Sequence, residues 1–258
     1  MAWGNRRGRR NLRESTSMRS FKIGGLGLIA VAVVALTTFA LGSAQSNADP
    51  TATAGPIPTY GTARVAPPAV KFFGDSYTGG SEMGGVDDVG WPAIACVELG
   101  CTASVESSSG AGYINGEADG RGLNAALDST RPGSLANVIV LAAGANDYRA
   151  TPAENALAAD AFIARLQGRW PDANLVILGP FWRDDQPSEV LLQLDAHLEA
   201  RAAAIGANFA SPIRLGWLTG ENGRFIGSDN VHPDDEGHAF IATQVIPLLD
   251  AAGARREP

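Results

Sequence analysis

Short apolar runs alternate with amphipathic stretches along the chain from residue 69 onward. The runs are rich in branched aliphatic residues, as buried strands are, and the stretches between them place apolar residues at helical spacing. The predicted strands are 69–73, 103–106, 137–143, 174–179 and the weaker 208–210, and the predicted helices are 153–169, 188–204 and 233–249. This alternation predicts a parallel sheet of about five strands with helices on both faces.

The last predicted helix carries its own start signal. Pro233 stands at the first predicted position, and three acids follow it in the first turn (Asp234, Asp235 and Glu236). A proline loses no hydrogen bond at this position, and acids there offset the positive end of the helix dipole. We therefore expect this helix to begin at residue 233.

The first 48 residues have the pattern of an export signal. Seven basic residues precede an apolar run over 23–42, and Ser46-Asn47-Ala48 resembles a small-residue cleavage site. The run is also long enough to span a bilayer as an uncleaved anchor. In either case the positive-inside rule places the body of the protein outside the cytoplasm. We expect a cleaved signal and a secreted protein, with a membrane anchor as the alternative and no other membrane contact.

The rest of the chain divides at a proline-rich stretch. Residues 49–68 hold five prolines and little apolar periodicity, which predicts a linker. A single domain is predicted over 69–252, followed by a C-terminal tail over 253–258. After residue 48 the chain has 13 basic and 26 acidic residues, a formal charge of −13. This charge disfavours binding to nucleic acids, and we expect a monomer.

Cys96 and Cys101 are the only cysteines. A close, even pair in an exported protein predicts one short disulfide, and two reduced thiols buried on a helix are the alternative. A metal site would need further ligands nearby, and no such cluster is evident, so no metal is predicted.

Candidate chemistry follows the predicted strands, because the carboxyl ends of parallel strands gather where such folds bind ligands. Ser76 follows the first strand and could act both as a nucleophile and, through its amide, as an oxyanion donor; an ordinary turn or helix cap is the alternative. Asn146 follows the third strand and could aim its side-chain amide at an oxyanion. Gly110 follows the second strand and is the preferred backbone donor, with Gly112 as the alternative.

A histidine with an acid beside it precedes the last helix. Asp229 stands three residues before His232, so its carboxylate can bind one imidazole nitrogen while the other takes the serine proton. His197 is expected in solvent, and His238 lies within the helix, where packing or exposure is expected. Only His232 combines a loop position with an acid placed to orient it.

Aromatic residues also follow the strands. They are expected to line the rim of the catalytic mouth, although some of them could instead cap the core. The residues are Tyr77, Tyr113, Tyr148 and Trp182.

Taken together, the ordered blocks resemble those of the SGNH/GDSL hydrolases over roughly residues 69–250. The blocks are Gly74-Asp75-Ser76, Gly110, Gly144-Ala145-Asn146-Asp147 and Asp229-Asn230-Val231-His232. This resemblance implies a flavodoxin-like three-layer α/β/α sandwich and a Ser76–His232–Asp229 triad. It also implies an oxyanion hole made by the amides of Ser76 and Gly110 and the side chain of Asn146.

The resemblance further implies hydrolysis of carboxylic esters through an acyl-enzyme, without a metal or organic cofactor. The expected substrates are lipid, acyl or acetyl-sugar esters. An α/β-hydrolase elbow is absent, because the position that would be its second glycine is Thr78. Two alternatives remain: an extracytoplasmic acyltransferase that uses the same triad, and a non-catalytic surface-binding domain.

Overall fold

The computed structural model describes residues 66–257. The predicted signal or anchor (1–48) and most of the predicted linker (49–68) lie outside the described residues. None of the helices within 66–257 combines the length and the apolar character needed to cross a bilayer.

The centre of the domain is a parallel sheet of five strands in the order β2-β1-β3-β4-β5. The strands are β1 (Ala69–Gly74), β2 (Thr102–Ser107), β3 (Val138–Ala142), β4 (Asn174–Leu178) and β5 (Asn208–Ala210). Each predicted strand is present within a residue or two of its predicted bounds. The chain moves outward from β1 to β2 and then returns to place β3 on the other side of β1, so the strand order reverses between β1 and β3.

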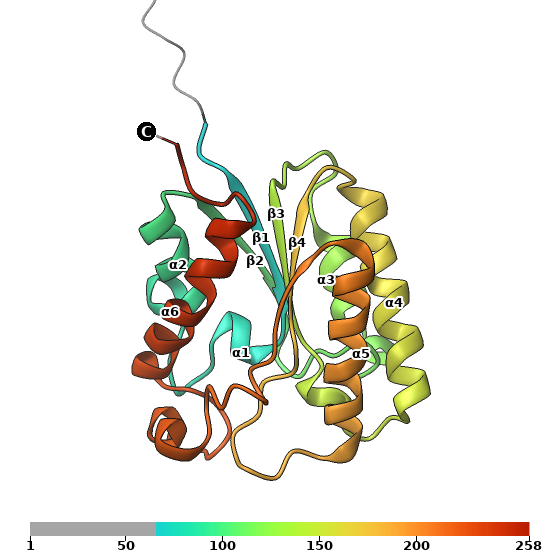
Figure 1. Ribbon diagram of the computed structural model, residues 1–258, viewed down its shortest axis with the longest axis vertical. Helices are drawn as coiled ribbons and strands as arrows, with labels where there is room; N and C mark the ends of the chain where they lie inside the picture. Colours follow the sequence, from blue (N-terminus) through green and yellow to red (C-terminus); the bar gives the residue numbers. More distant parts are fainter. Residues whose placement is uncertain (1–65, 258) are drawn as a thin grey trace, which may run out of the picture. The chain divides into compact units, whose positions relative to one another are not determined.

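Helices cover both faces of this sheet, as Figure 1 shows, which confirms the three-layer α/β/α prediction. On one face lie α1 (Ser76–Gly79), α2 (Trp91–Leu99) and α6 (Asp235–Ala251), and on the other lie α3 (Leu123–Ser129), α4 (Pro152–Arg169) and α5 (Glu189–Ile205). Short 3₁₀ turns occupy Asp87–Val89, Glu117–Asp119, Ala145–Asp147 and Gly220–Phe225.

The alternation of side chains along the strands divides the core into two layers. In β3, Val138 and Val140 face the cluster formed with α2 and α6, whereas Ile139 and Leu141 face the cluster formed with α3, α4 and α5. All four side chains are fully buried. Strands that are buried on both faces have continuous apolar sequences. For this reason β3 could be predicted from the sequence.

The helix ends follow their capping residues. Thr151 and Glu154 form a reciprocal capping box at the start of α4. At α6 the cap is Asp234, whose side chain accepts a hydrogen bond from the Gly237 amide at 2.8 Å. The helix therefore starts at Asp235, two residues later than predicted, because Asp234 caps the helix instead of lying within it.

The predicted disulfide joins Cys96 in α2 to Cys101, just before β2, with 4.6 Å between their Cα atoms. The alternative of two thiols on one helix is wrong, because α2 ends at Leu99. The predicted tail also packs on the domain. Ala254 is fully buried, and the Arg256 amide donates to the Leu99 carbonyl at 2.9 Å. The C-terminal segment and the disulfide therefore meet at the same end of α2.

Reduction of this disulfide is expected to lower the free energy of unfolding by about 2 kcal/mol, because closing even a short loop restricts the unfolded chain. Urea unfolding of 49–258 with and without dithiothreitol measures the difference. The double variant Cys96→Ala/Cys101→Ala is the matched control, since its stability should not respond to the reductant. Equal stability of the oxidised and reduced native chains would contradict this expectation.

Candidate active site

The candidate catalytic residues lie beyond the carboxyl end of the sheet. Ser76 follows β1 and Asn146 follows β3, so they flank the point where the strand order reverses, the usual ligand-binding position in such sheets. Gly110 follows β2, the strand on the other side of β1. Asp229 and His232 come from the loop before α6. The topology thus brings residues more than 150 positions apart to one edge.

Ser76 is the first residue of α1, and its position is fixed on both sides. The preceding Asp75 caps the helix, its Oδ1 accepting a hydrogen bond from the Tyr77 amide at 2.9 Å. Gly74 must be glycine, because a Cβ there would lie 2.5 Å from the Ala142 carbonyl oxygen of β3. This close approach of β1 and β3 allows the sharp turn that places Ser76 at the edge of the sheet.

Three side chains form a continuous hydrogen-bonded series. His232 Nε2 lies 2.8 Å from Ser76 Oγ, and His232 Nδ1 lies 2.6 Å from Asp229 Oδ2. Ser76 is 6% exposed. The structure therefore brings together the serine, histidine and aspartate that the sequence analysis grouped.

The Asp229 carboxylate also organises its own loop. Its Oδ1 accepts hydrogen bonds from the amides of Val231 at 2.8 Å and His232 at 2.9 Å. Between them Asn230 adopts a φ of +57°, which asparagine tolerates better than most residues. Partial desolvation opposes ionisation, but the bonds from His232 and the two amides outweigh it and lower the pKa of Asp229 to about 2. Asp229 is thus a carboxylate at every pH at which the protein would be assayed.

The Asn146 side chain is held between two acceptors. Its Nδ2 donates to Asp75 Oδ2 at 3.0 Å and to the Ala111 carbonyl at 2.9 Å. Both N–H groups are therefore occupied, and an additional contact to an oxyanion requires one of these bonds to be shared. Burial, reinforced by the nearby Asp147 and opposed by the Tyr77 amide, raises the pKa of Asp75 to about 7. The Asp75 carboxyl is therefore partly neutral near pH 7, which limits its repulsion of a negative charge beside Ser76.

Of the two glycines considered as oxyanion donors, only Gly110 has a free amide. Within residues 66–257, the amides of Ser76 and Gly110 donate no hydrogen bond, whereas the Gly112 amide donates to the Asn115 carbonyl at 2.9 Å. Gly110 has a φ of +75°, a conformation that favours glycine. Gly112 is therefore unsuited to the role in this conformation.

The loop that carries Gly110 is anchored by Asp147, a residue to which the sequence analysis gave no role. Asp147 is buried, and its carboxylate accepts hydrogen bonds from the amides of Tyr113, Ile114 and Asn115 at 2.7 to 3.1 Å. Burial raises the pKa of Asp147, and these three amides oppose that rise. Its position directly after Asn146 was the only signal in the sequence.

The predicted aromatic rim is wrong for two of its four residues. Tyr77 is 4% exposed and Tyr113 is 3% exposed, and both pack in the core. Tyr77 stacks on Phe181, whereas Tyr113 lies edge-on to a helix α4 side chain. Tyr148 is exposed and Trp182 is half-buried, with its Nε1 donating to Asp184. For Tyr148 and Trp182, the rim role remains a prediction.

Neither of the other two histidines is hydrogen-bonded to Ser76 within the described residues. His197, predicted to lie in solvent, is half-buried and pairs with Asp160 at 3.1 Å. His238 is fully buried, as its packing alternative predicted, and accepts a hydrogen bond from the Trp91 amide. Burial lowers the pKa of His238 to about 4. It is therefore a neutral core residue.

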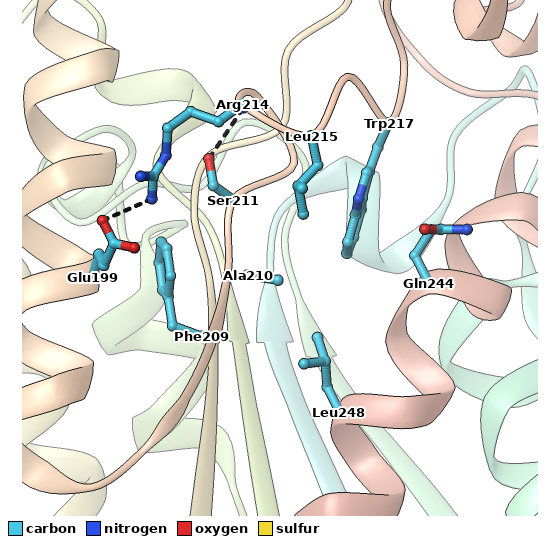
Figure 2. Close-up of a pocket in the computed structure, with 9 residues that line it drawn as sticks. All are labelled: Glu199, Phe209, Ala210, Ser211, Arg214, Leu215, Trp217, Gln244 and Leu248. Atoms are coloured by element: carbon cyan, nitrogen blue, oxygen red, sulfur yellow. Dashed lines mark hydrogen bonds and ion pairs between the residues drawn. The ribbon is translucent and has the colours of Figure 1, made fainter.

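A pocket of about 430 Å³ opens beside β5, between α5 and α6. It is lined by Glu199, Phe209, Ala210, Ser211, Arg214, Leu215, Trp217, Gln244 and Leu248 (Figure 2). Its Arg214 pairs with Glu199 at 2.9 Å and with the buried Asp195 at 2.8 Å, so this charge is already balanced. None of the three hydrogen-bonded residues described above lines the pocket.

The fold and this arrangement are those expected of an ester hydrolase. The chain belongs to the GDSL-like Lipase/Acylhydrolase family, whose sequence model matches residues 72–240. It is 30% identical over 197 residues to a GDSL lipase of Mycobacterium tuberculosis, and the match covers 72% of this chain and 82% of that protein. The protein is therefore a carboxylic ester hydrolase of the SGNH/GDSL type.

Solved structures share the fold at lower identity. A family two carbohydrate esterase from Clostridium thermocellum superposes with a TM-score of 0.57 at 18% identity, covering 71% of this chain and 63% of that one. Phospholipase A1 from Streptomyces albidoflavus superposes with a TM-score of 0.52 at 18% identity, covering 73% and 100%. These likenesses confirm the α/β architecture.

Proposed function

We propose that this protein is an exported serine esterase whose triad is Ser76, His232 and Asp229. The observation that carries the proposal is the series Ser76 Oγ–His232 Nε2 (2.8 Å) and His232 Nδ1–Asp229 Oδ2 (2.6 Å). An ionised Asp229 fixes the tautomer that leaves Nε2 free to accept the serine proton. The substrates that we propose are lipid, acyl or acetyl-sugar esters, in keeping with the names of two structural relatives, a carbohydrate esterase and a phospholipase A1.

The reaction proceeds by two acyl transfers. His232 Nε2 removes the Ser76 proton as Oγ attacks the ester carbonyl carbon, and the carbonyl oxygen becomes an oxyanion. The tetrahedral intermediate collapses, the bond to the alcohol breaks, and the alcohol leaves with the proton held by His232. Water then attacks the acyl-enzyme, again losing its proton to His232, which returns that proton to Ser76 as the acid departs.

The oxyanion is stabilised by the amides of Ser76 and Gly110, with Asn146 as a third donor. Support for the two amides is that neither donates a hydrogen bond within residues 66–257, so each is available without breaking an existing bond. Asn146 is held by Asp75 and Ala111 in a fixed orientation between the ends of β1 and β3. The two free amides are held in place before the reaction and therefore cost no reorganisation during it, whereas Asn146 must share one of its two existing bonds.

Asn146→Ala is expected to lower kcat by about 10²- to 10³-fold with little change in KM, because the lost bond forms only in the transition state. Steady-state kinetics on a nitrophenyl ester measure both constants. Asn124→Ala, at the half-buried second position of α3, is the control for loss of an asparagine. A fall in kcat no larger than that of the control would remove Asn146 from the oxyanion hole.

A covalent probe tests the nucleophile directly. An alkyl fluorophosphonate should modify the native protein once, and mass spectrometry should locate the adduct on Ser76. Labelling should be lost in Ser76→Ala and slowed strongly in His232→Ala, because the histidine activates the serine. Modification at another residue, or none in a folded protein, would reject the proposed triad.

Export is supported by the basic and apolar pattern of residues 1–48 and by the disulfide. Disulfides persist in oxidising compartments and are rare in the cytosol, and the Cys96–Cys101 bond closes within the domain. Fractionation of the producing cells and N-terminal sequencing of the mature protein test this part. A new N-terminus after Ala48 indicates a secreted form, an intact N-terminus in the membrane indicates an anchor, and a cytosolic protein rejects export.

A further inference from the structure

Position 77 departs from the letters that name the family, because tyrosine stands where the name GDSL has leucine. The Tyr77 side chain is buried, and its ring stacks on Phe181 with the planes 5° apart. Its hydroxyl crosses to the loop before α6, where it donates to the Val231 carbonyl at 2.7 Å. A leucine could fill part of this space but could not make that bond.

The peptide unit between Val231 and His232 is held by a hydrogen bond at each end. The carbonyl of Val231 and the amide of His232 belong to the same planar peptide. The carbonyl accepts from Tyr77 at 2.7 Å, and the amide donates to Asp229 Oδ1 at 2.9 Å. The orientation of the peptide that leads into His232 is therefore fixed from two sides.

Tyr77 itself is well anchored. Its amide donates to Asp75 Oδ1 at 2.9 Å, and its carbonyl accepts from Trp91 Nε1 at 2.8 Å. Burial, and then the charge of Asp75, raise the pKa of the Tyr77 phenol, so the hydroxyl keeps its proton. Tyr77 directly follows Ser76, and its hydroxyl binds the residue that directly precedes His232. This rigid side chain therefore connects the segment that carries Ser76 to the segment that carries His232.

The segments around Ser76 and His232 are therefore joined by two hydrogen bonds. One runs between Ser76 Oγ and His232 Nε2, and the other between the Tyr77 hydroxyl and the Val231 carbonyl. Once Ser76 is acylated, Oγ has no proton and the first bond is lost. The second is unaffected by the chemistry.

We propose that Tyr77 is a positioning residue that keeps His232 in place in the acyl-enzyme, so that the imidazole can activate water for deacylation. This inference rests on the proposed roles of Ser76 and His232. It predicts that loss of the Tyr77 hydroxyl slows deacylation more than acylation, because during acylation the serine bond still holds the imidazole.

The test is Tyr77→Phe, which keeps the ring and its stack and removes only the oxygen. Tyr113→Phe is the matched control, since Tyr113 is equally buried and its hydroxyl has no hydrogen-bond partner within the described residues. Stopped-flow release of nitrophenol separates the burst, which reports acylation, from the steady state, which reports deacylation. For Tyr77→Phe we expect the steady-state rate to fall about tenfold and the burst rate by less than about threefold, as one hydrogen bond is lost. Tyr113→Phe should match the native enzyme in both phases.

A second measurement does not depend on turnover. In the fluorophosphonate adduct, which also lacks the serine hydroxyl, the proton NMR signal of His232 Nδ1–H should exchange with water faster in Tyr77→Phe than in Tyr113→Phe. Equal exchange, or a Tyr77→Phe variant that slows both kinetic phases to the same extent, would overturn the inference.

Ser76→Ala, assayed in parallel, distinguishes failure of the proposed triad from failure of the proposed role of Tyr77. If Ser76→Ala remains active, the triad is wrong; if it is inactive and Tyr77→Phe behaves as the control does, only the role of Tyr77 is wrong.

Discussion

Ser76→Ala, His232→Ala and the double variant are expected to lose nearly the same activity, with kcat for ester hydrolysis lower by about 10⁴- to 10⁶-fold in each. The reason is that the two side chains act in one step of the proposed mechanism. Without Ser76 Oγ there is no nucleophile for the base to activate, and without His232 Nε2, 2.8 Å away, the hydroxyl is a poor nucleophile near neutral pH. Removing the second member of such a unit costs little once the first is gone.

The measurement is steady-state hydrolysis of nitrophenyl esters of two chain lengths by all three variants, each shown to fold by its melting temperature. Ser129→Ala and His197→Ala are the controls. Ser129 is exposed at the end of α3, and the half-buried His197 of α5 pairs with Asp160 of α4. A double variant much slower than either single one would mean that the two residues act independently, and appreciable activity in Ser76→Ala would place the nucleophile elsewhere.

Much of the fold could be predicted because its strands are buried on both faces. The run around Val138–Ala142 needs no alternation to be recognised, and the long helices α4 and α5 carry clear apolar stripes. Helix α2 was not predicted, because its sequence is apolar on nearly every side and so lacks helical periodicity. Helix α3 has only seven residues, too few for a periodic pattern to emerge.

In the site, the sequence allowed the positions of residues to be predicted but not the directions of their side chains. Residues that follow strands could be placed at one edge of the sheet, and Asn146 does bind Asp75, the neighbour of Ser76. His232 was selected differently, by its spacing from Asp229 before the last helix, and it lies 2.8 Å from Ser76 Oγ. The direction of each side chain could not be inferred in the same way. Tyr77 turns inward onto Phe181, and the Asp147 carboxylate reaches amides more than 30 residues away. Such contacts depend on tertiary packing, which a single sequence does not display.

Asp229→Asn is expected to lower kcat by about 10⁴-fold while leaving the fold intact. The asparagine keeps an oxygen that can accept from the Val231 and His232 amides, as Oδ1 does at 2.8 and 2.9 Å. Its NH₂ group, however, would face His232 Nδ1, which lies 2.6 Å from Asp229 Oδ2. A donor at that position favours the tautomer whose proton is on Nε2, and this tautomer cannot accept a proton from Ser76.

Asp160→Asn is the matched control, because Asp160 of α4 also pairs with a histidine, the half-buried His197 of α5, at 3.1 Å, and neither residue is hydrogen-bonded to Ser76. Both variants lose one carboxylate beside an imidazole, and only Asp229→Asn should lose activity. Since the pKa of Asp229 is about 2, acid inactivation of the native enzyme above pH 4 must come from other groups, and the Asn variant should remain impaired across that range. A native-like rate for Asp229→Asn at neutral pH would mean that the loop orients His232 without the carboxylate, and the Tyr77 bond to Val231 would then be the contact that does so.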